Sequence, residues 1–202
     1  MLPLHFVPLQ HFGDPGKEQG SGHYLEPPGA QNNVLQNNLF CFKIMFKRCF
    51  KLRLFEIDNI KNFMRGLFIS ALFDELEIRQ ALFRTKLTLS IEGKINRDWL
   101  STDENEMVSS EYVKWKEIKP TAANFIKGGR APSAIKLVFS VSPEKTEKIL
   151  PEAKALFLNI LYSDKKLTCT TGLALKTFST DKKYELIWDE YIENFLKKNS
   201  LI

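Results

Sequence analysis

The clearest pattern of apolar and polar positions lies in residues 155–178. Residues 155–162 are apolar at almost every position, which is typical of a central strand covered on both faces. A turn follows, and residues 167–170 then alternate between apolar side chains and threonine, which predicts a second strand. Because Gly172 can adopt a positive φ, it predicts another reversal and a third short strand.

An amphipathic helix follows this meander. Apolar residues recur at spacings of three and four and form one stripe: Tyr184, Ile187, Trp188, Tyr191, Ile192, Phe195 and Leu196. A helix of this length is marginal in water by itself. We therefore expect the stripe to pack on the sheet with Trp188 deeply buried. Asp189, Glu190 and Glu193 fall on the polar side, and we expect water to solvate them.

The same periodicities predict further elements upstream. Alternating apolar residues predict strands at residues 40–54, 76–83, 87–91 and 135–141. Apolar stripes and capping residues predict helices after Asp58, from Trp115 to Ile126, and after Ser142-Pro143. Glu92-Gly93 predicts a hairpin turn. Gly128 is the expected C-terminal cap of the helix at Trp115, and residues 101–110 read as an acidic, solvated loop.

This order of elements predicts an α+β fold with a largely antiparallel sheet and flanking helices. Residues 50–96 and 134–178 both read as strand, helix and three further strands. Sliding DNA clamps use this βαβββ order for one domain, so a duplicated, clamp-like unit is one hypothesis for the fold. The helices at residues 115–127 and at the C-terminus do not fit that plan.

The first 38 residues differ in composition from the rest. They hold five of the nine prolines, five of the ten glycines and all three histidines. Residues 13–33 have no periodicity that could bury a face. We interpret residues 1–38 as a disordered extension or a mis-assigned start, and residues 39–202 as a single α+β domain.

Composition limits the class of protein. The chain has 202 residues, of which 44% are apolar, enough for a buried core. Three cysteines, an odd number, argue against a disulfide framework, so we expect a cytoplasmic protein with reduced thiols. No apolar run reaches the ~18 residues that a membrane-spanning helix needs. The net charge of +5 allows an acidic partner without requiring one.

The predicted domain lacks the residues that several kinds of catalysis require. Between residues 24 and 202 there is no histidine, so the predicted domain has no histidine base and no histidine-containing metal site. Cys169 lies in a predicted strand, where we expect a small buried hydrophobe. No catalytic residue, metal or cofactor is predicted. One alternative stays open, which is catalysis by carboxylates alone. The carboxylates near Trp99 that could take part are Asp98, Asp103, Glu104 and Glu106.

The best ligand candidate is the segment Lys127-Gly128-Gly129-Arg130. Glycine amides with flanking cations can hold a phosphate. The segment is not a P-loop, because the Walker spacing is missing and the glycines follow a helix. A helix cap and turn is the competing interpretation. The surrounding residues are rich in cations, which favours a nucleic-acid surface as a further hypothesis: Lys114, Lys116, Lys119, Lys127, Arg130 and Lys136.

From about Lys51 to the end, the chain resembles a bacterial family known only as a domain of unknown function, family 5721. Five stretches carry the resemblance: IEGKIN (91–96), Lys114-Trp115, FIKGGRAP (125–132), LTCTTG with LKTF (167–178), and WDEYIENFLKK (188–198). The resemblance covers about three quarters of the chain. It implies no activity.

Three functions therefore stay open. The first is a non-catalytic binding or interaction domain of unknown partner. The second is a clamp-like protein that binds nucleic acid or another anionic ligand, and the third is a carboxylate-dependent enzyme. A salt-dependent shift of mixed-sequence DNA would favour the second over the first. Loss of activity on replacing Asp98 or Asp103 would favour the third.

The N-terminal segment yields the first testable prediction. A chain that begins at Met45 should melt within a few degrees of the full-length chain, because residues 1–38 have no pattern able to bury surface. Scanning calorimetry of the two chains measures the difference. A large loss of melting temperature would contradict the interpretation.

Overall fold

Six antiparallel strands form one sheet in the order β1-β6-β5-β4-β2-β3. The computed structural model describes residues 53–202, and the strands are β1 (Leu54–Glu56), β2 (Glu77–Arg84), β3 (Thr88–Glu92), β4 (Ala134–Ser140), β5 (Ala153–Ser163) and β6 (Lys166–Leu175). The helices are α2 (Ile60–Phe68), α3 (Thr102–Met107), α4 (Trp115–Ile126), α5 (Pro143–Ile149) and α6 (Lys183–Lys198). The predicted α+β class is confirmed. The predicted boundary at residue 38 and most of the strand predicted at 40–54 lie outside the described residues.

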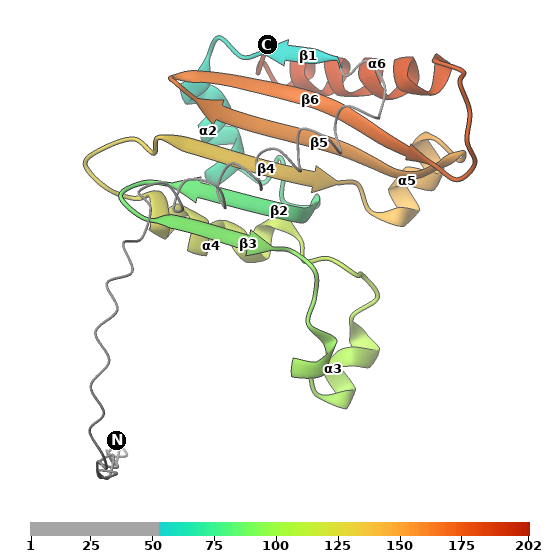
Figure 1. Ribbon diagram of the computed structural model, residues 1–202, viewed down its shortest axis with the longest axis horizontal. Helices are drawn as coiled ribbons and strands as arrows, with labels where there is room; N and C mark the ends of the chain where they lie inside the picture. Colours follow the sequence, from blue (N-terminus) through green and yellow to red (C-terminus); the bar gives the residue numbers. More distant parts are fainter. Residues whose placement is uncertain (1–52) are drawn as a thin grey trace, which may run out of the picture. The chain divides into compact units, whose positions relative to one another are not determined.

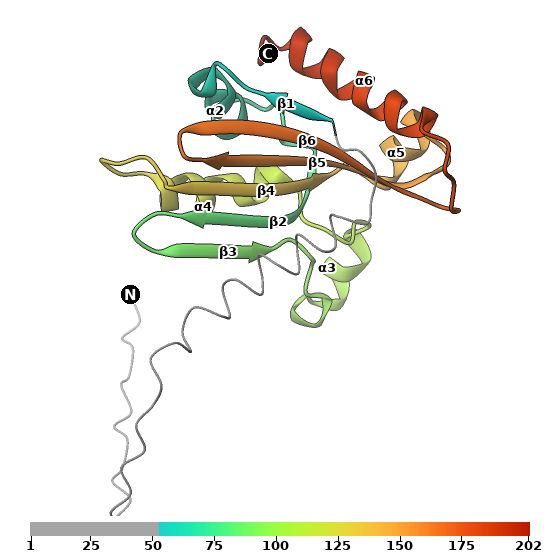
Figure 2. The ribbon, with the colours of Figure 1, turned by 45° about the horizontal axis from the view of Figure 1, so that its top comes forward.

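The helices α2, α4 and α6 lie on one face of the sheet (Figures 1 and 2). Among residues 53–202, no helix covers the opposite face. The register follows the alternation of the strands: Leu137 and Phe139 of β4 face the helices, and Val138 faces the other way. No helix in this part of the chain is both long and apolar enough to cross a membrane.

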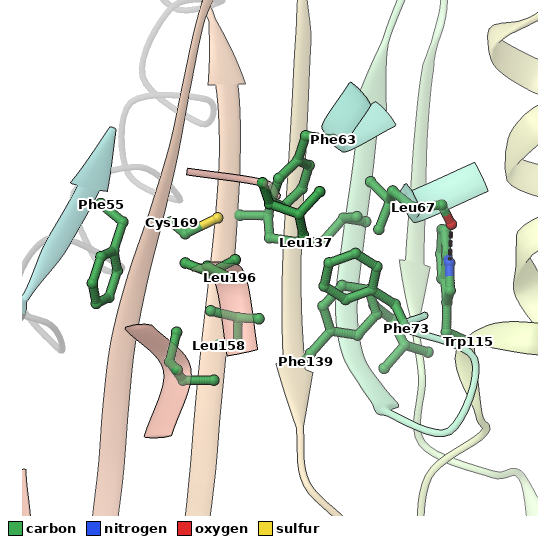
Figure 3. Close-up of a cluster of buried hydrophobic side chains, with 14 of the residues drawn as sticks. Phe55, Phe63, Leu67, Phe73, Trp115, Leu137, Phe139, Leu158, Cys169 and Leu196 are labelled. Carbon is green, nitrogen blue, oxygen red and sulfur yellow. Dashed lines mark hydrogen bonds between the residues drawn. The ribbon is translucent and has the colours of Figure 1, made fainter. Parts of the chain in front are cut away.

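Large apolar side chains fill the space between the helices and the sheet (Figure 3). Phe63 of α2 and Phe73 pack with ring centres 5.5 Å apart, and Phe73 stacks on Phe139 of β4. Trp115, the first residue of α4, is fully buried. Its indole N–H donates to the carbonyl of Leu67 at 2.7 Å, so the buried nitrogen keeps a hydrogen bond.

The meander prediction was wrong in one respect. Gly172 does not reverse the chain but lies inside β6, paired with Phe157 of β5. β6 therefore runs unbroken for ten residues and replaces the two short strands expected. The reversal between β5 and β6 is at Asp164 and Lys165, which both have positive φ. These two non-glycine residues make the turn that the sequence also predicted there.

The hairpin predicted at Glu92-Gly93 is also wrong. The β2–β3 turn lies at residues 85–87, where the Thr85 N–H donates to the Leu87 carbonyl. Gly93 has a different role, because a Cβ at this position would lie 1.8 Å from the carbonyl oxygen of Ile78. Only glycine allows the chain to lie this close to the β2 backbone.

Each half of the described chain has the order βαββ, not βαβββ. The third strand expected in the first half is reduced to one bridge between Lys94 and Tyr112. The two halves also pair differently, since β4 lies between β2 and β5 whereas β1 pairs only with β6. Kinship with DNA clamps stays a hypothesis without support from these pairings.

Local signals placed the starts of α2, α4 and α5 within one residue. Ser142 caps α5 with Pro143 at its first position, as predicted. The cap of α2 is Asn59 and not Asp58, and its side chain accepts from the Asn62 N–H at 3.0 Å. The loop expected at residues 101–110 contains the short helix α3. Pro120 lies inside α4, where it removes one backbone hydrogen bond.

The helix α6 docks through part of its apolar stripe. Trp188, Ile192 and Leu196 are buried, and the Trp188 indole N–H donates to the Phe157 carbonyl at 2.9 Å. The burial predicted for Trp188 is confirmed. Ile187 and Tyr191 remain 43% and 48% exposed, so the stripe is wider than the surface that covers it.

Asp189 was expected on the solvated side of α6, and this was wrong. The helix α6 docks with Trp188 against the sheet, and this orientation places Asp189 against β6. Asp189 is buried there, and its carboxylate accepts a 2.5 Å hydrogen bond from the Thr171 hydroxyl. Burial raises the pKa of Asp189, although the Thr171 hydrogen bond and Arg53 oppose the shift. Arg53 itself forms an ion pair with Glu193 at 2.6 Å. Asp189 therefore has no ion-pair partner among the described residues.

The second prediction concerns this carboxylate. A raised pKa in the folded state adds stability below the pKa of the unfolded chain, and this contribution is lost as the pH rises through the folded-state pKa. Asp189→Asn keeps an acceptor for Thr171 and removes the charge. Its melting temperature should exceed that of the wild type by a few degrees at pH 7, and the difference should vanish near pH 4. Thermal melts across this pH range test it, and a destabilised variant at pH 7 would contradict it.

Candidate functional site

The predicted anion segment is an exposed loop after α4. Lys127 caps the helix, and its N–H donates to the Ala123 carbonyl at 3.0 Å. Neither Gly128 nor Gly129 has a positive φ, and a Cβ at either position would meet no atom within 4 Å. The predicted Gly128 cap is therefore wrong by one residue. The structure leaves Lys127 and Arg130 in solvent, and their role in anion binding stays a prediction.

Three of the six cations named around this loop form ion pairs with neighbouring acids. Glu75 accepts from Lys114 at 2.7 Å and from Lys116 at 3.2 Å, and these lysines lower the pKa of Glu75 to about 2. Lys119 pairs with Asp74 at 2.5 Å. The acids precede β2 and lie some forty residues away in sequence. Two carboxylates thus offset part of the basic excess seen in the sequence.

The carboxylates around Trp99 do not converge. Glu104 forms a capping box at the start of α3: its carboxylate accepts from the Ser101 N–H at 2.9 Å, and the Ser101 hydroxyl accepts from the Glu104 N–H. This hydrogen bonding lowers the pKa of Glu104. Asp98, Asp103 and Glu106 are exposed. In the described part of the chain, no three acidic, histidine or cysteine residues are arranged to hold a metal ion.

Cys169 is fully buried in β6, as predicted. Burial raises the pKa of its thiol to about 12. A thiol that stays protonated at neutral pH is a poor nucleophile. Its place in the core is therefore structural.

The feature that the sequence did not single out is the chain between β3 and α4. Residues 94–112, called here the α3 arm, leave the sheet beyond the end of β3 and return (Figures 1 and 2). Two backbone hydrogen bonds close its base, from the Ile95 N–H to Glu111 and from the Val113 N–H to Gly93. The α3 arm thus projects from a fixed base instead of packing on the helices.

A buried polar cluster ties the returning end of the arm to the sheet. Glu77 is buried at the start of β2, and its carboxylate accepts from Ser110 at 2.8 Å and from Ser140 at 3.1 Å. The Arg79 Nε donates to the Ser140 hydroxyl at 2.6 Å, and its guanidinium lies 3.4 Å from the centre of the Tyr112 ring. These contacts hold Ser110 and Tyr112 against β2 and β4.

The interior of the arm is organised by Arg97. Its guanidinium donates to the carbonyls of Asn105, Val108 and Ser110 at 3.1–3.5 Å. In the other direction, the Asn105 side chain donates to the Arg97 carbonyl at 3.0 Å. The segment before α3 is thereby held to the segment after it. The arm has a defined conformation although it has almost no core.

This arm presents two large apolar side chains to solvent. Trp99 is 80% exposed and Met107 is 83% exposed. The other two tryptophans, Trp115 and Trp188, are buried to 0% and 1% exposure. Tryptophan is highly buried on average, and together with tyrosine and arginine it is enriched at the energetic centres of protein interfaces. We therefore regard the α3 arm as the candidate functional site.

One signal in the sequence could have found it. A tryptophan and a methionine stand in an acidic stretch without periodicity, so no helix or strand pattern accounts for their burial. The sequence prediction used Trp99 only to mark the position of nearby carboxylates.

Residues 66–202 match the family of unknown function DUF5721. The chain belongs to this family. No curated protein and no solved structure matches the chain. The resemblance inferred from the sequence is confirmed, with a match that begins within α2. The DUF5721 region includes the α3 arm and the loop at 127–130 and leaves β1 outside.

The third prediction tests the anion segment. Lys127→Ala with Arg130→Ala should change the free energy of unfolding by no more than about 0.5 kcal/mol, because both side chains are exposed. If the loop holds anions, the double variant should also bind labelled mixed-sequence DNA more weakly and with a flatter salt dependence. Lys61→Ala with Arg65→Ala on α2 removes the same charge and serves as the control. Equal DNA binding by both double variants would show that the loop only ends the helix and does not bind anions.

Proposed function

We propose that this DUF5721 domain is a non-catalytic interaction module and that the α3 arm is its contact element. The observation that carries the proposal is the exposure of Trp99 and Met107 on an arm whose conformation is fixed from within. Large aromatic side chains bury much apolar area, and they are often among the few residues that carry most of the binding energy of an interface.

The construction of the arm supports this role. A flexible loop must be ordered when it binds, and this ordering costs free energy. In the α3 arm, Arg97 and the Ser101–Glu104 capping box already fix the backbone around Trp99. The backbone that carries the contact side chains is therefore ordered before a partner binds. An arm of this kind suits a partner with a preformed apolar pocket.

The charge of the arm indicates the chemistry of that partner. Residues 94–112 contain five acidic and two basic residues, a net charge of −3, whereas the whole chain carries +5. Opposite charges around an interface speed association and select among partners. The expected partner therefore has an apolar pocket bordered by lysine or arginine.

The two alternative functions receive less support. An acidic arm repels nucleic acid, and three of the lysines that favoured a nucleic-acid surface are paired with Asp74 and Glu75. A carboxylate-dependent enzyme needs carboxylates that converge on a substrate, and those on the arm point into solvent or cap α3. Both alternatives remain weaker proposals.

Site-specific photo-crosslinking tests the proposal. The chain is expressed in its native cells with the photoreactive residue p-benzoylphenylalanine in place of Trp99, and in a parallel strain in place of Phe178. Phe178 is 89% exposed and lies between β6 and α6, so it controls for exposure alone. Irradiation should give a discrete adduct from position 99 that position 178 does not give. Absence of any adduct from position 99 would overturn the proposed function.

A further inference from the structure

A second surface lies at the end of the sheet opposite the α3 arm. The sheet register sets one residue from each of five strands in a row: Thr88 of β3, Arg84 of β2, Ala134 of β4, Ser163 of β5 and Lys166 of β6. The β2–β3 turn, the loop before β4 and the β5–β6 turn therefore lie side by side at this end (Figures 1 and 2). We call residues 84–88, 127–133 and 163–166 together the basic end.

Hydrogen bonds hold these segments in place. The Ser133 N–H and hydroxyl both donate to the Arg84 carbonyl, at 2.8 and 3.1 Å, and this fixes the end of the loop beside the β2–β3 turn. The Thr85 N–H closes that turn on the Leu87 carbonyl at 2.8 Å. The β5–β6 turn is closed by the paired strands on both sides. Three segments that are far apart in the sequence thus share one surface.

This surface carries a large excess of positive charge. Its three segments contain one carboxylate, Asp164, which accepts from the Ser163 hydroxyl at 3.0 Å. They contain six exposed cations: Arg84, Lys86, Lys127, Arg130, Lys165 and Lys166. The strand β1 also ends at this side, beyond β6, with Glu56, and Asp58 follows it. When these two are counted, six cations stand against three carboxylates.

The six cations have no acidic partners in the fold. None of them forms an ion pair with a carboxylate of residues 53–202. The lysines that do pair, Lys114, Lys116 and Lys119, are not part of the basic end. Like charges gathered without neutralisation repel one another and destabilise the folded state. An anionic partner would remove this repulsion.

The shape of the basic end fits a line of phosphates. The row from β2 to β6 crosses three strand spacings, which is about 14 Å at ~4.8 Å each. Duplex DNA carries one charge per about 1.7 Å of its axis, so a surface of this width meets several phosphates.

The apolar side chains of the basic end do not resemble a protein interface. The centre of such an interface is usually rich in aromatic residues. Leu87 is the one large apolar side chain exposed in these three segments, and the exposed aromatic residues Trp99, Phe178 and Tyr191 lie outside them. Nucleic acid is therefore favoured over an acidic protein as the partner.

We propose that the basic end binds the phosphate backbone of nucleic acid without reading its sequence. Phosphate contacts supply affinity and carry no direct sequence information. The exposed backbone of Gly128 and Gly129 allows a phosphate to approach between two cations. The strand β3 runs from the basic end at Thr88 to the base of the arm after Glu92, so this second function does not depend on the function proposed for the arm.

Fluorescence polarisation of a labelled mixed-sequence DNA duplex, titrated with the full chain, tests the proposal. The affinity should fall steeply between about 50 and 200 mM salt. Lys86→Ala with Lys166→Ala removes one cation from each of two turns. This variant should bind at least several-fold more weakly, and the magnitude of its log–log salt slope should fall by roughly 2, at about 0.9 for each lost phosphate contact.

Lys145→Ala with Lys148→Ala is the matched control. These two lysines are exposed on α5, which lies at the arm end of the sheet between β4 and β5. The control variant should bind DNA like the wild type, with the same salt slope. Thermal melts confirm that each variant is folded.

Three results would overturn the proposal. The first is a wild-type chain that leaves the polarisation unchanged at about 50 mM salt, where phosphate binding is strong. The second is a Lys86→Ala with Lys166→Ala variant that binds no more weakly than the α5 control. The third is competition by poly-glutamate that is as effective as competition by unlabelled DNA of equal charge, since the surface would then accept any acidic chain.

The Trp99→Ser variant separates this proposal from the function of the arm. It should bind DNA like the wild type, because Trp99 lies on the arm at the other end of the sheet. If position 99 gives no crosslink and DNA binding persists, the proposed function of the arm falls and the basic end stands. Loss of DNA binding in a folded Trp99→Ser chain would overturn the separation of the two surfaces.

Discussion

The burial of Trp115 is the interaction on which the rest of the domain depends. Its ring meets Phe68 of α2 and Phe139 of β4 edge-on, with ring centres 5.7 and 5.5 Å apart. Its indole N–H is satisfied by the Leu67 carbonyl, so the polar atom can be buried without a desolvation penalty. Its backbone N–H donates to Leu76 at 2.8 Å. One residue thus joins α2, α4, β4 and the start of β2.

The position of the α3 arm is a consequence of the burial of Trp115. Because Trp115 fixes the start of α4 and β3 ends at Glu92, the chain between them must leave and return over a short distance. Gly93 permits the close approach to the Ile78 carbonyl, and the Val113 N–H donates to the Gly93 carbonyl at the base of the arm. The arm therefore lies outside the core, and its stability comes from hydrogen bonds to Arg97 and not from apolar burial. This is why its tryptophan remains exposed to solvent.

The surroundings of a charged residue in the fold differ from what its sequence neighbours suggest, because residues far apart in the chain form pairs. Lys114, Lys116 and Lys119 read as a basic cluster, yet each forms an ion pair with Asp74 or Glu75 from the segment before β2. Asp189 shows the reverse, since its helical position indicated solvent and the docking of α6 buried it against Thr171. In both cases the sequence shows the charge, and only the packing of separate elements decides its environment.

The sequence by itself determined the α+β class, the antiparallel strands, the positions of five described strands and four helices to within a few residues, and the membership of DUF5721. These depend on apolar periodicity and capping, which act over a few neighbouring residues. The tertiary structure alone decided the uninterrupted β6, the pairing of β1 with β6, and the exposure of Trp99 and Tyr191. Each of these depends on which surfaces meet across the chain, and no local pattern of residues records that.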